Sequence, residues 1–169
     1  GTGIDAPVLA IGAVVFDPVT GDIDTDKAFY INIGLEDAVK NGAKIDANTV
    51  LWWLKQSDEA REQLTRKGYA TSFALLQFCA WLRDGKGHHN DLCIWGNGPT
   101  FDCSILAATY KRAGIDVPWP YWGERCVRTI SWLAPDIEVE RVGTHHNALD
   151  DAITQAKHVS RVLNEYQRQ

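Results

Sequence analysis

The apolar run Val8–Phe16 constrains the fold more than any other segment of the chain. It is less than half as long as a membrane-spanning helix, which needs about 20 apolar residues, and Gly12 interrupts it. We therefore predict a β-strand that is buried on both faces, as in the sheet of an α/β protein. The segment Asp17–Asp22 contains proline and glycine and predicts a turn. Residues 28–33 then alternate like a second strand, which predicts a hairpin.

The rest of the chain predicts helices and two short strands, and it contains no linker or repeat. Apolar spacing and capping residues predict helices over Thr49–Leu54, Asp58–Leu64, a segment from about Thr71 to just before Gly85, Ser104–Arg112 and about Ala148 to Tyr166. Short strands are expected over Leu92–Trp95 and from about Arg125 to Ile130. Helices that cross between later strands predict one α/β domain spanning residues 1–169.

Composition narrows the class of protein. The 169 residues are 45% apolar and 23% charged, which excludes a disordered chain or a coiled coil. The net charge of −5 argues against binding nucleic acid through bulk positive charge, but it is compatible with an acidic metal site. The four cysteines show no zinc-ligand spacing, and Cys79 and Cys93 lie in apolar segments, which favours reduced, buried thiols. No signal-peptide pattern precedes the first strand, so we expect a soluble, cytoplasmic protein without membrane association.

The segment Asn97–Asp102 directly follows a predicted strand and opens a predicted helix. A strand that ends in glycines and leads into a helix places the next acid at the carboxyl edge of the sheet, where α/β proteins build their sites. Asp102 is therefore a candidate site residue, although an acid there could equally serve to stabilise a helix N-terminus. Asn97 could bind substrate or fix its own turn, and Phe101 could stack on a base or anchor the helix start.

The segment Gly143–Asp151 leads into the last predicted helix. Asn147 is a suitable N-cap and Asp150 supports the same helix end, so both have a structural explanation. Asp151 is rotated about 100° further around the helix, and His146 lies five residues before it on the approach loop. A histidine and an acid placed in this way can face one cleft as a base and a metal ligand, or the histidine can be part of a solvated loop.

The pattern N-x-x-x-F-D after a strand, followed by H-x-x-x-x-D at the last helix, resembles the second and third motifs of the DEDDh 3′→5′ exonucleases. This family has the ribonuclease H-like fold and includes ribonuclease T and the proofreading exonucleases. The segments Val8–Pro18, Thr49–Asp58 and His145–Asp151 are similar to its phage and prophage-type members. The resemblance covers essentially the whole chain and implies a mixed sheet flanked by helices.

The resemblance also implies roles for individual residues. Asp102 and Asp151 would be metal-binding carboxylates, and His146 would be the general base that takes a proton from water. Two divalent ions about 3.5–4 Å apart suit in-line phosphodiester hydrolysis, and carboxylate oxygens suit Mg²⁺ or Mn²⁺. We expect a 3′→5′ exonuclease that releases nucleoside monophosphates from single-stranded ends, with DNA slightly favoured over RNA. A homodimer is compatible with this expectation.

One motif of the family is missing. Its first motif, D-x-E on the first strand, would lie ahead of Gly1, and the chain contains no Met. We therefore expect a truncated N-terminal strand and little activity from the printed chain alone. The alternative is a catalytically inactive nucleic-acid-binding module of the same fold.

Stacking and phosphate contacts have their own candidates. Trp119 and Trp122 lie in a proline-rich loop and are candidates to stack on a single strand. Local cations for phosphate contacts are Arg125, Arg128 and Arg141, although solvated surface is the usual place for any one of them. Lys111 and Arg112, after the Asp102 segment, are further candidates of the same kind.

Overall fold

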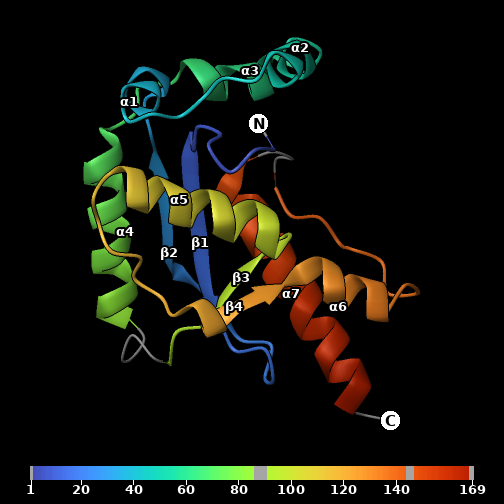
Figure 1. The fold of residues 1–169 in the computed structure, drawn as a ribbon. Helices are drawn as coiled ribbons and strands as arrows, with labels where there is room; N and C mark the ends of the chain where they lie inside the picture. Colours follow the sequence, from blue (N-terminus) through green and yellow to red (C-terminus); the bar gives the residue numbers. More distant parts are fainter. Residues whose placement is uncertain (1, 86–90, 144–146, 168–169) are drawn as a thin grey trace.

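The computed structural model describes residues 2–85, 91–143 and 147–167, and Figure 1 shows an α/β arrangement of helices around short strands. In chain order the elements are β1 (Ala10–Phe16), β2 (Ile23–Asn32), α1 (Leu35–Lys40), α2 (Ala47–Trp53), α3 (Asp58–Thr65), α4 (Thr71–Gly85), β3 (Ile94–Gly96), η2 (Pro99–Cys103), α5 (Ser104–Arg112), η3 (Tyr121–Gly123), β4 (Glu124–Cys126), α6 (Val127–Leu133) and α7 (Ala148–Gln167).

The predicted hairpin is confirmed. Strand β1 pairs antiparallel with β2, with Ala10 opposite Asn32 and Phe16 opposite Ile23. The turn is held by Asp17, whose Oδ1 accepts the amide of Val19 at 2.7 Å. The prediction that the strand is buried on both faces is confirmed in part, because no residue of β1 is exposed but only Ile11 is fully buried. Among the described residues β1 pairs with β2 alone, so one of its edges lacks a neighbouring strand.

The second pair of strands is shorter than predicted. Strand β3 pairs in parallel with β4, and the two pairs form separate two-stranded sheets in the described structure. The predicted strand from about Arg125 to Ile130 is mostly wrong, because the chain turns into α6 at Val127. Cys126 caps this helix: its Sγ accepts the amide of Thr129 at 3.4 Å.

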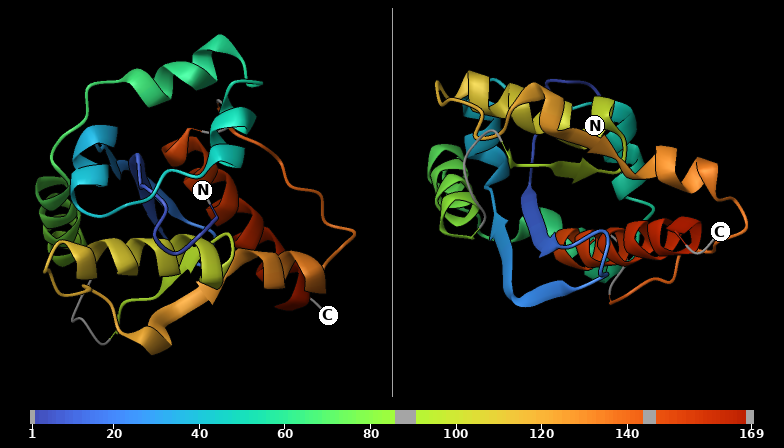
Figure 2. Two further views of the ribbon diagram at one scale, coloured as in Figure 1. Left: turned by 45° about the horizontal axis from the view of Figure 1, so that its top comes forward. Right: turned by 90° about the horizontal axis from the view of Figure 1, so that it is seen from below.

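Helices cover the β1–β2 hairpin on both sides. Figures 1 and 2 show α5 on one side of these strands and α7 on the other, with α4 alongside β2 and α1 to α3 beyond one end of the hairpin. The core on the side of α4 and α5 centres on Tyr110, which is fully buried and donates its hydroxyl to the Leu75 carbonyl at 3.0 Å. Trp119 packs edge-on against Tyr110 and is itself buried. None of the described helices is long and apolar enough to cross a membrane.

Helix α7 packs closely against β1 because Gly12 has no side chain. A Cβ atom at position 12 would overlap the backbone of Ala148 and Leu149, in the first turn of α7. The glycine that interrupts the apolar strand in the sequence therefore sets how closely the start of α7 approaches the sheet.

We expect Gly12→Ala to destabilise the protein by about 1–3 kcal/mol or more, because the overlap is with backbone atoms that cannot change rotamer. Urea unfolding measures this loss. Gly34→Ala is the matched control, since its Cβ would lie 3.6 Å from the nearest atom, the Gly68 carbonyl oxygen, which is an ordinary contact. Equal stabilities of the two variants would contradict the packing role of Gly12.

Candidate active site

Asp102 is held at the end of β3 by a turn that two glycines make feasible. Gly98 has a φ of 120°, which side chains rarely tolerate. At Gly96 a Cβ would lie only 3.1 Å from Cβ of Asp102, so the glycine lets η2 lie close to the strand. The backbone amide of Asn97 donates to Oδ2 of Asp102 at 2.6 Å. The strand-to-helix connection predicted from the sequence is thus the device that orients this carboxylate.

The surroundings of Asp102 shift its pKa. Desolvation by the surrounding protein raises the pKa of its carboxyl group, although the side chain keeps an exposed surface. The Asn97 amide and the positive charge of Arg128 oppose this shift, whereas the negative charge of Asp151 adds to it. Asp102 and Asp151, which are 49 positions apart in the sequence, are therefore close enough to interact electrostatically.

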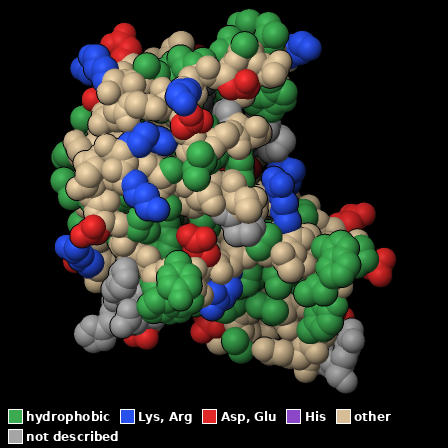
Figure 3. Space-filling view, viewed as in Figure 1, with side chains coloured by type: hydrophobic (Ala, Val, Ile, Leu, Met, Phe, Trp, Pro, Cys, Tyr) green, Lys and Arg blue, Asp and Glu red, His purple; other side chains and the backbone are tan. Residues whose placement is uncertain are grey.

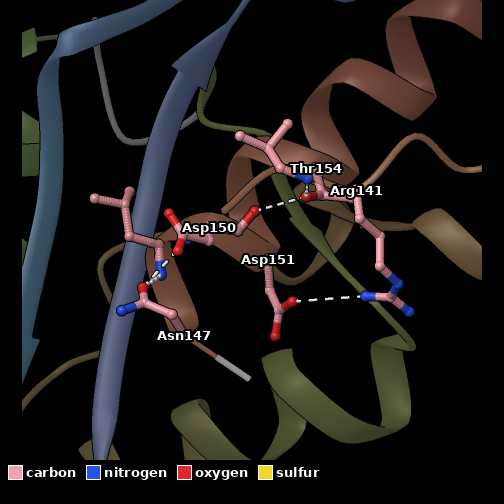
Figure 4. Close-up of polar contacts among 7 residues, drawn as sticks. Arg141, Asn147, Asp150, Asp151 and Thr154 are labelled. Carbon is pink, nitrogen blue, oxygen red and sulfur yellow. Dashed lines mark hydrogen bonds and ion pairs between the residues drawn. The ribbon is translucent and has the colours of Figure 1, made fainter. Parts of the chain in front are cut away.

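Asp151 lies in the first turn of α7, and Figure 4 shows how this turn is capped. Oδ1 of Asn147 accepts the amides of Leu149 at 3.0 Å and Asp150 at 3.3 Å, as the sequence predicted. The half-buried carboxylate of Asp151 points toward Arg141, with 3.9 Å between Oδ1 and Nη1 (Figure 4). This separation makes an ion pair and is too long for a hydrogen bond.

A cavity of about 270 Å³ lies beside Asp151. Asn97, Arg141 and Asp151 contribute to its wall, and so do residues of α6 and α7. A carboxylate at the wall of a polar cavity, with a second carboxylate close by, is suited to hold a divalent cation. In the ranges that the structure describes, no group of three or more His, Cys, Asp or Glu side chains is placed to hold a metal. Mg²⁺ nevertheless commonly binds through one or two carboxylates together with water and phosphate oxygens, which Asp102 and Asp151 fit.

Residues 1–163 match the family described as the 3′-5′ exoribonuclease Rv2179c-like domain. The chain belongs to this family. No individual curated protein matches the chain. The prediction of a 3′→5′ exonuclease, and so of a hydrolase, is confirmed at the level of the family.

In this exoribonuclease-like domain the structure brings together three of the five predicted site residues. The charge of Asp151 reaches Asp102, and Asn97 lies between the two parts of the site, because its amide binds Asp102 and the residue lines the cavity beside Asp151. Phe101 is half-buried next to Asp102 and is not among the described residues that line the cavity. His146 lies outside the described residues.

Six of the residues that line the cavity were not predicted from the sequence, among them Ser131, Gln155 and His158. Gln155 and His158 follow Asp151 by four and seven positions on α7, and Ser131 comes from α6. Helical spacing from Asp151 was the signal that could have found the first two. Ser131 donates its hydroxyl to the Val127 carbonyl at 3.1 Å. Because a hydroxyl has a single proton, the imidazole Nε2 of His158 is the donor in the 2.9 Å contact between Ser131 and His158. Burial, and then the charge of Arg161, lowers the pKa of His158, which favours this neutral form.

The aromatic and thiol predictions have mixed outcomes. Trp119 is wrong as a stacking residue, because it is buried in the core and donates its indole N–H to Glu124 at 3.1 Å. Trp122 is exposed and stays a candidate. Cys79 is buried as predicted, whereas Cys93 is exposed because the strand begins after it, at Ile94.

We expect Asp102→Asn to raise the melting temperature of the metal-free protein at neutral pH. The pKa of Asp102 in the folded protein is raised above its usual 3.8, so the fold favours the protonated carboxyl group. The stability that protonation provides is fully present below about pH 3.8 and is lost as the pH rises through the folded-state pKa. Asparagine keeps an oxygen for the Asn97 amide and carries no charge. Thermal unfolding at pH 7 and pH 3 measures the effect: the difference should be positive at pH 7 and vanish at pH 3. A variant that melts below the parent at pH 7 would contradict the prediction.

Proposed function

We propose that this domain hydrolyses phosphodiester bonds at the 3′ ends of single-stranded nucleic acid and releases nucleoside monophosphates. The observation that carries the proposal is that Asp151 lines a polar cavity and its charge reaches Asp102, in a chain whose family is described as 3′-5′ exoribonuclease-like. The finer assignment is a DEDDh-type exonuclease of the ribonuclease H-like fold, similar to phage-type members and ribonuclease T. The motif pair ending at Asp102 and Asp151 supports it.

The proposed chemistry assigns one task to each residue. Asp102 and Asp151 would hold divalent cations, Mg²⁺ or Mn²⁺, two of them in the complete site. Such ions, when bound, activate water and stabilise the charge that develops on phosphate oxygens. His146 would accept the proton of the attacking water. Asn97 orients the Asp102 carboxylate through its amide and contributes to the cavity wall, where it would hydrogen-bond the substrate.

The substrate and the setting are further parts of the proposal. The family description names RNA, so single-stranded RNA is the first substrate to test, and the slight preference for DNA stays a prediction. The four cysteines are free, which suits a reducing compartment such as the cytoplasm. A single domain over residues 1–169 and a homodimer likewise stay predictions.

The second candidate is a nucleic-acid-binding module without catalytic activity. It is favoured by one observation, namely that the described residues bring together only two of the carboxylates that a two-ion site needs. The two candidates make the same prediction for binding and opposite predictions for turnover.

The experiment follows the products from matched RNA and DNA oligonucleotides, labelled at either end, with Mg²⁺, Mn²⁺ or EDTA. The protein is used with its native N-terminus. The enzyme should release a 3′ label at once as a mononucleotide, shorten 5′-labelled strands stepwise, and stop in EDTA. Internal cuts or release from the 5′ end would contradict the 3′→5′ assignment. Binding without metal-dependent turnover would establish the binding module.

A further inference from the structure

Cations are sparse around the candidate active site. Figure 3 shows Lys and Arg side chains scattered singly over the face seen in Figure 1, with acidic side chains among them, rather than gathered in a basic surface. With a net charge of −5, the chain offers no bulk attraction for a polyanion. A strand whose phosphates approach Asp102 and Asp151 therefore needs particular cations beside these two carboxylates.

Two arginines stand next to the two carboxylates. The Arg141 guanidinium lies 3.9 Å from Asp151, its side chain is 59% exposed, and it lines the cavity. Arg128 is exposed, and its positive charge acts on Asp102. Each carboxylate thus has an arginine whose charge acts on it.

Asn97 and Gly98 position Arg128. Its Nε donates to Oδ1 of Asn97 at 3.4 Å, and its Cζ lies 3.6 Å from the place where a Cβ of Gly98 would be. The guanidinium therefore lies against the turn that carries Asp102. Within the described residues Arg128 makes this one hydrogen bond, which leaves both Nη groups available to a ligand.

Arg125 differs from these two although it is close in sequence. Its Nη1 donates to the carbonyls of Trp122 at 2.7 Å and Glu124 at 3.0 Å. These bonds hold the turn that leads into β4, so Arg125 serves the backbone. The structure thereby separates the three arginine candidates into one structural residue and two that face the site.

We propose that Arg128 and Arg141 form a phosphate clamp that holds the backbone of the substrate strand beside the Asp102–Asp151 pair. The proposal rests on the proposed function and specifies how the same site binds its substrate. The planar guanidinium fork matches phosphate oxygens with two parallel hydrogen bonds. The loose contacts of both arginines, at 3.4 Å and 3.9 Å, are readily exchanged for phosphate. Asn97 acts as a positioning residue for Arg128.

The test measures binding of a fluorescent single-stranded RNA by anisotropy in EDTA, where hydrolysis does not interfere, over a range of salt concentrations. Each phosphate contact on a single strand contributes about 0.7 to the slope of log K against log salt. Arg128→Ala and Arg141→Ala should each lower the slope by about 0.7 and weaken binding alike for all sequences. Arg128→Lys and Arg141→Lys should keep the slope, because the charge remains.

Arg125→Ala is the matched control and should leave the slope unchanged. Urea unfolding of each variant tests whether a change in binding comes from a loss of folding. An unchanged slope in folded Arg128→Ala or Arg141→Ala, an equal decrease in Arg125→Ala, or no RNA binding by the unsubstituted protein would overturn the clamp. RNA hydrolysis with unchanged slopes would refute the clamp alone, whereas arginine-dependent binding without hydrolysis would refute the exonuclease and retain the clamp.

Discussion

Asp151→Asn is expected to lower kcat/KM for a single-stranded substrate by about 100–1000-fold, because metal-ion charge stabilisation contributes several kcal/mol at the transition state. The amide keeps the shape of the carboxylate and removes the charge that would hold the cation. Initial rates at increasing Mg²⁺ concentration measure both the loss and a shift of the metal dependence to higher concentration. Asp102→Asn should behave in the same way.

Asp150→Asn is the control for this prediction, since it removes the neighbouring acid from the same helix turn. An acid at a helix N-terminus stabilises the helix by about 0.3–1 kcal/mol, so this variant should lose a little stability and keep its activity. Equal activity losses in Asp150→Asn and Asp151→Asn would mean that the turn, rather than one carboxylate, is required. Full activity in both Asp102→Asn and Asp151→Asn would remove this pair from the site.

His146→Ala is expected to reduce kcat by about 100–10,000-fold, the range that a positioned general base contributes. The pH–rate profile is the decisive measurement. The parent protein should lose activity on the acid side as the imidazole becomes protonated, and the variant should lack that limb. His145→Ala is the adjacent control and should keep both the rate and the profile. A larger effect at His145 would assign the base to the neighbouring histidine.

The local elements that the sequence predicted correctly are those whose determinants are also local. Oδ2 of Asp46 accepts the amide of Thr49 at 2.7 Å at the start of α2, as expected of an N-cap. Helix α5 covers the predicted range Ser104–Arg112 and is followed by Gly114, which has a φ of 67°. A cap or a left-handed glycine acts within a few residues, so its effect can be predicted without the tertiary structure.

Helix α1 was missed because it depends on a distant partner. Helix α1 has six residues and no side-chain cap, but its Asp37 accepts the amide of Thr71 at 2.6 Å, across 34 positions. That hydrogen bond lowers the pKa of Asp37 and joins α1 to the start of α4. Helix α6 was missed for a different, local reason: its cap is the sulfur of Cys126, which accepts the Thr129 amide, and cysteine is not among the usual N-cap residues. Neither contact has a periodic signal in the sequence.

The residues of the candidate site also fall into those that the sequence predicted and those that it did not. Asp102 and Asp151 were predicted from two short motifs, and the structure places them within electrostatic reach of each other. The cavity wall formed by Ser131, Gln155 and His158 depends on how α6 packs on α7, which neither motif encodes. Trp119 was misassigned because a loop aromatic with proline neighbours looks exposed in the sequence, whereas its ring fills the core beside Tyr110.

The close packing of Gly12 against α7 has a mechanical consequence for the two carboxylates. Asp151 lies on α7, which packs on the β1–β2 hairpin, whereas Asp102 lies beside β3 and β4, and no strand ladder within the described residues joins the two pairs. The separation between the carboxylates therefore depends on packing at the interface between the two strand pairs, rather than on strand hydrogen bonds. Like charges on the two carboxylates would repel each other across this interface, and a cation held between them, as proposed above, would offset that repulsion. Under the proposed function, the packing of α7 on β1 at Gly12 would therefore also influence how tightly the two carboxylates hold a cation.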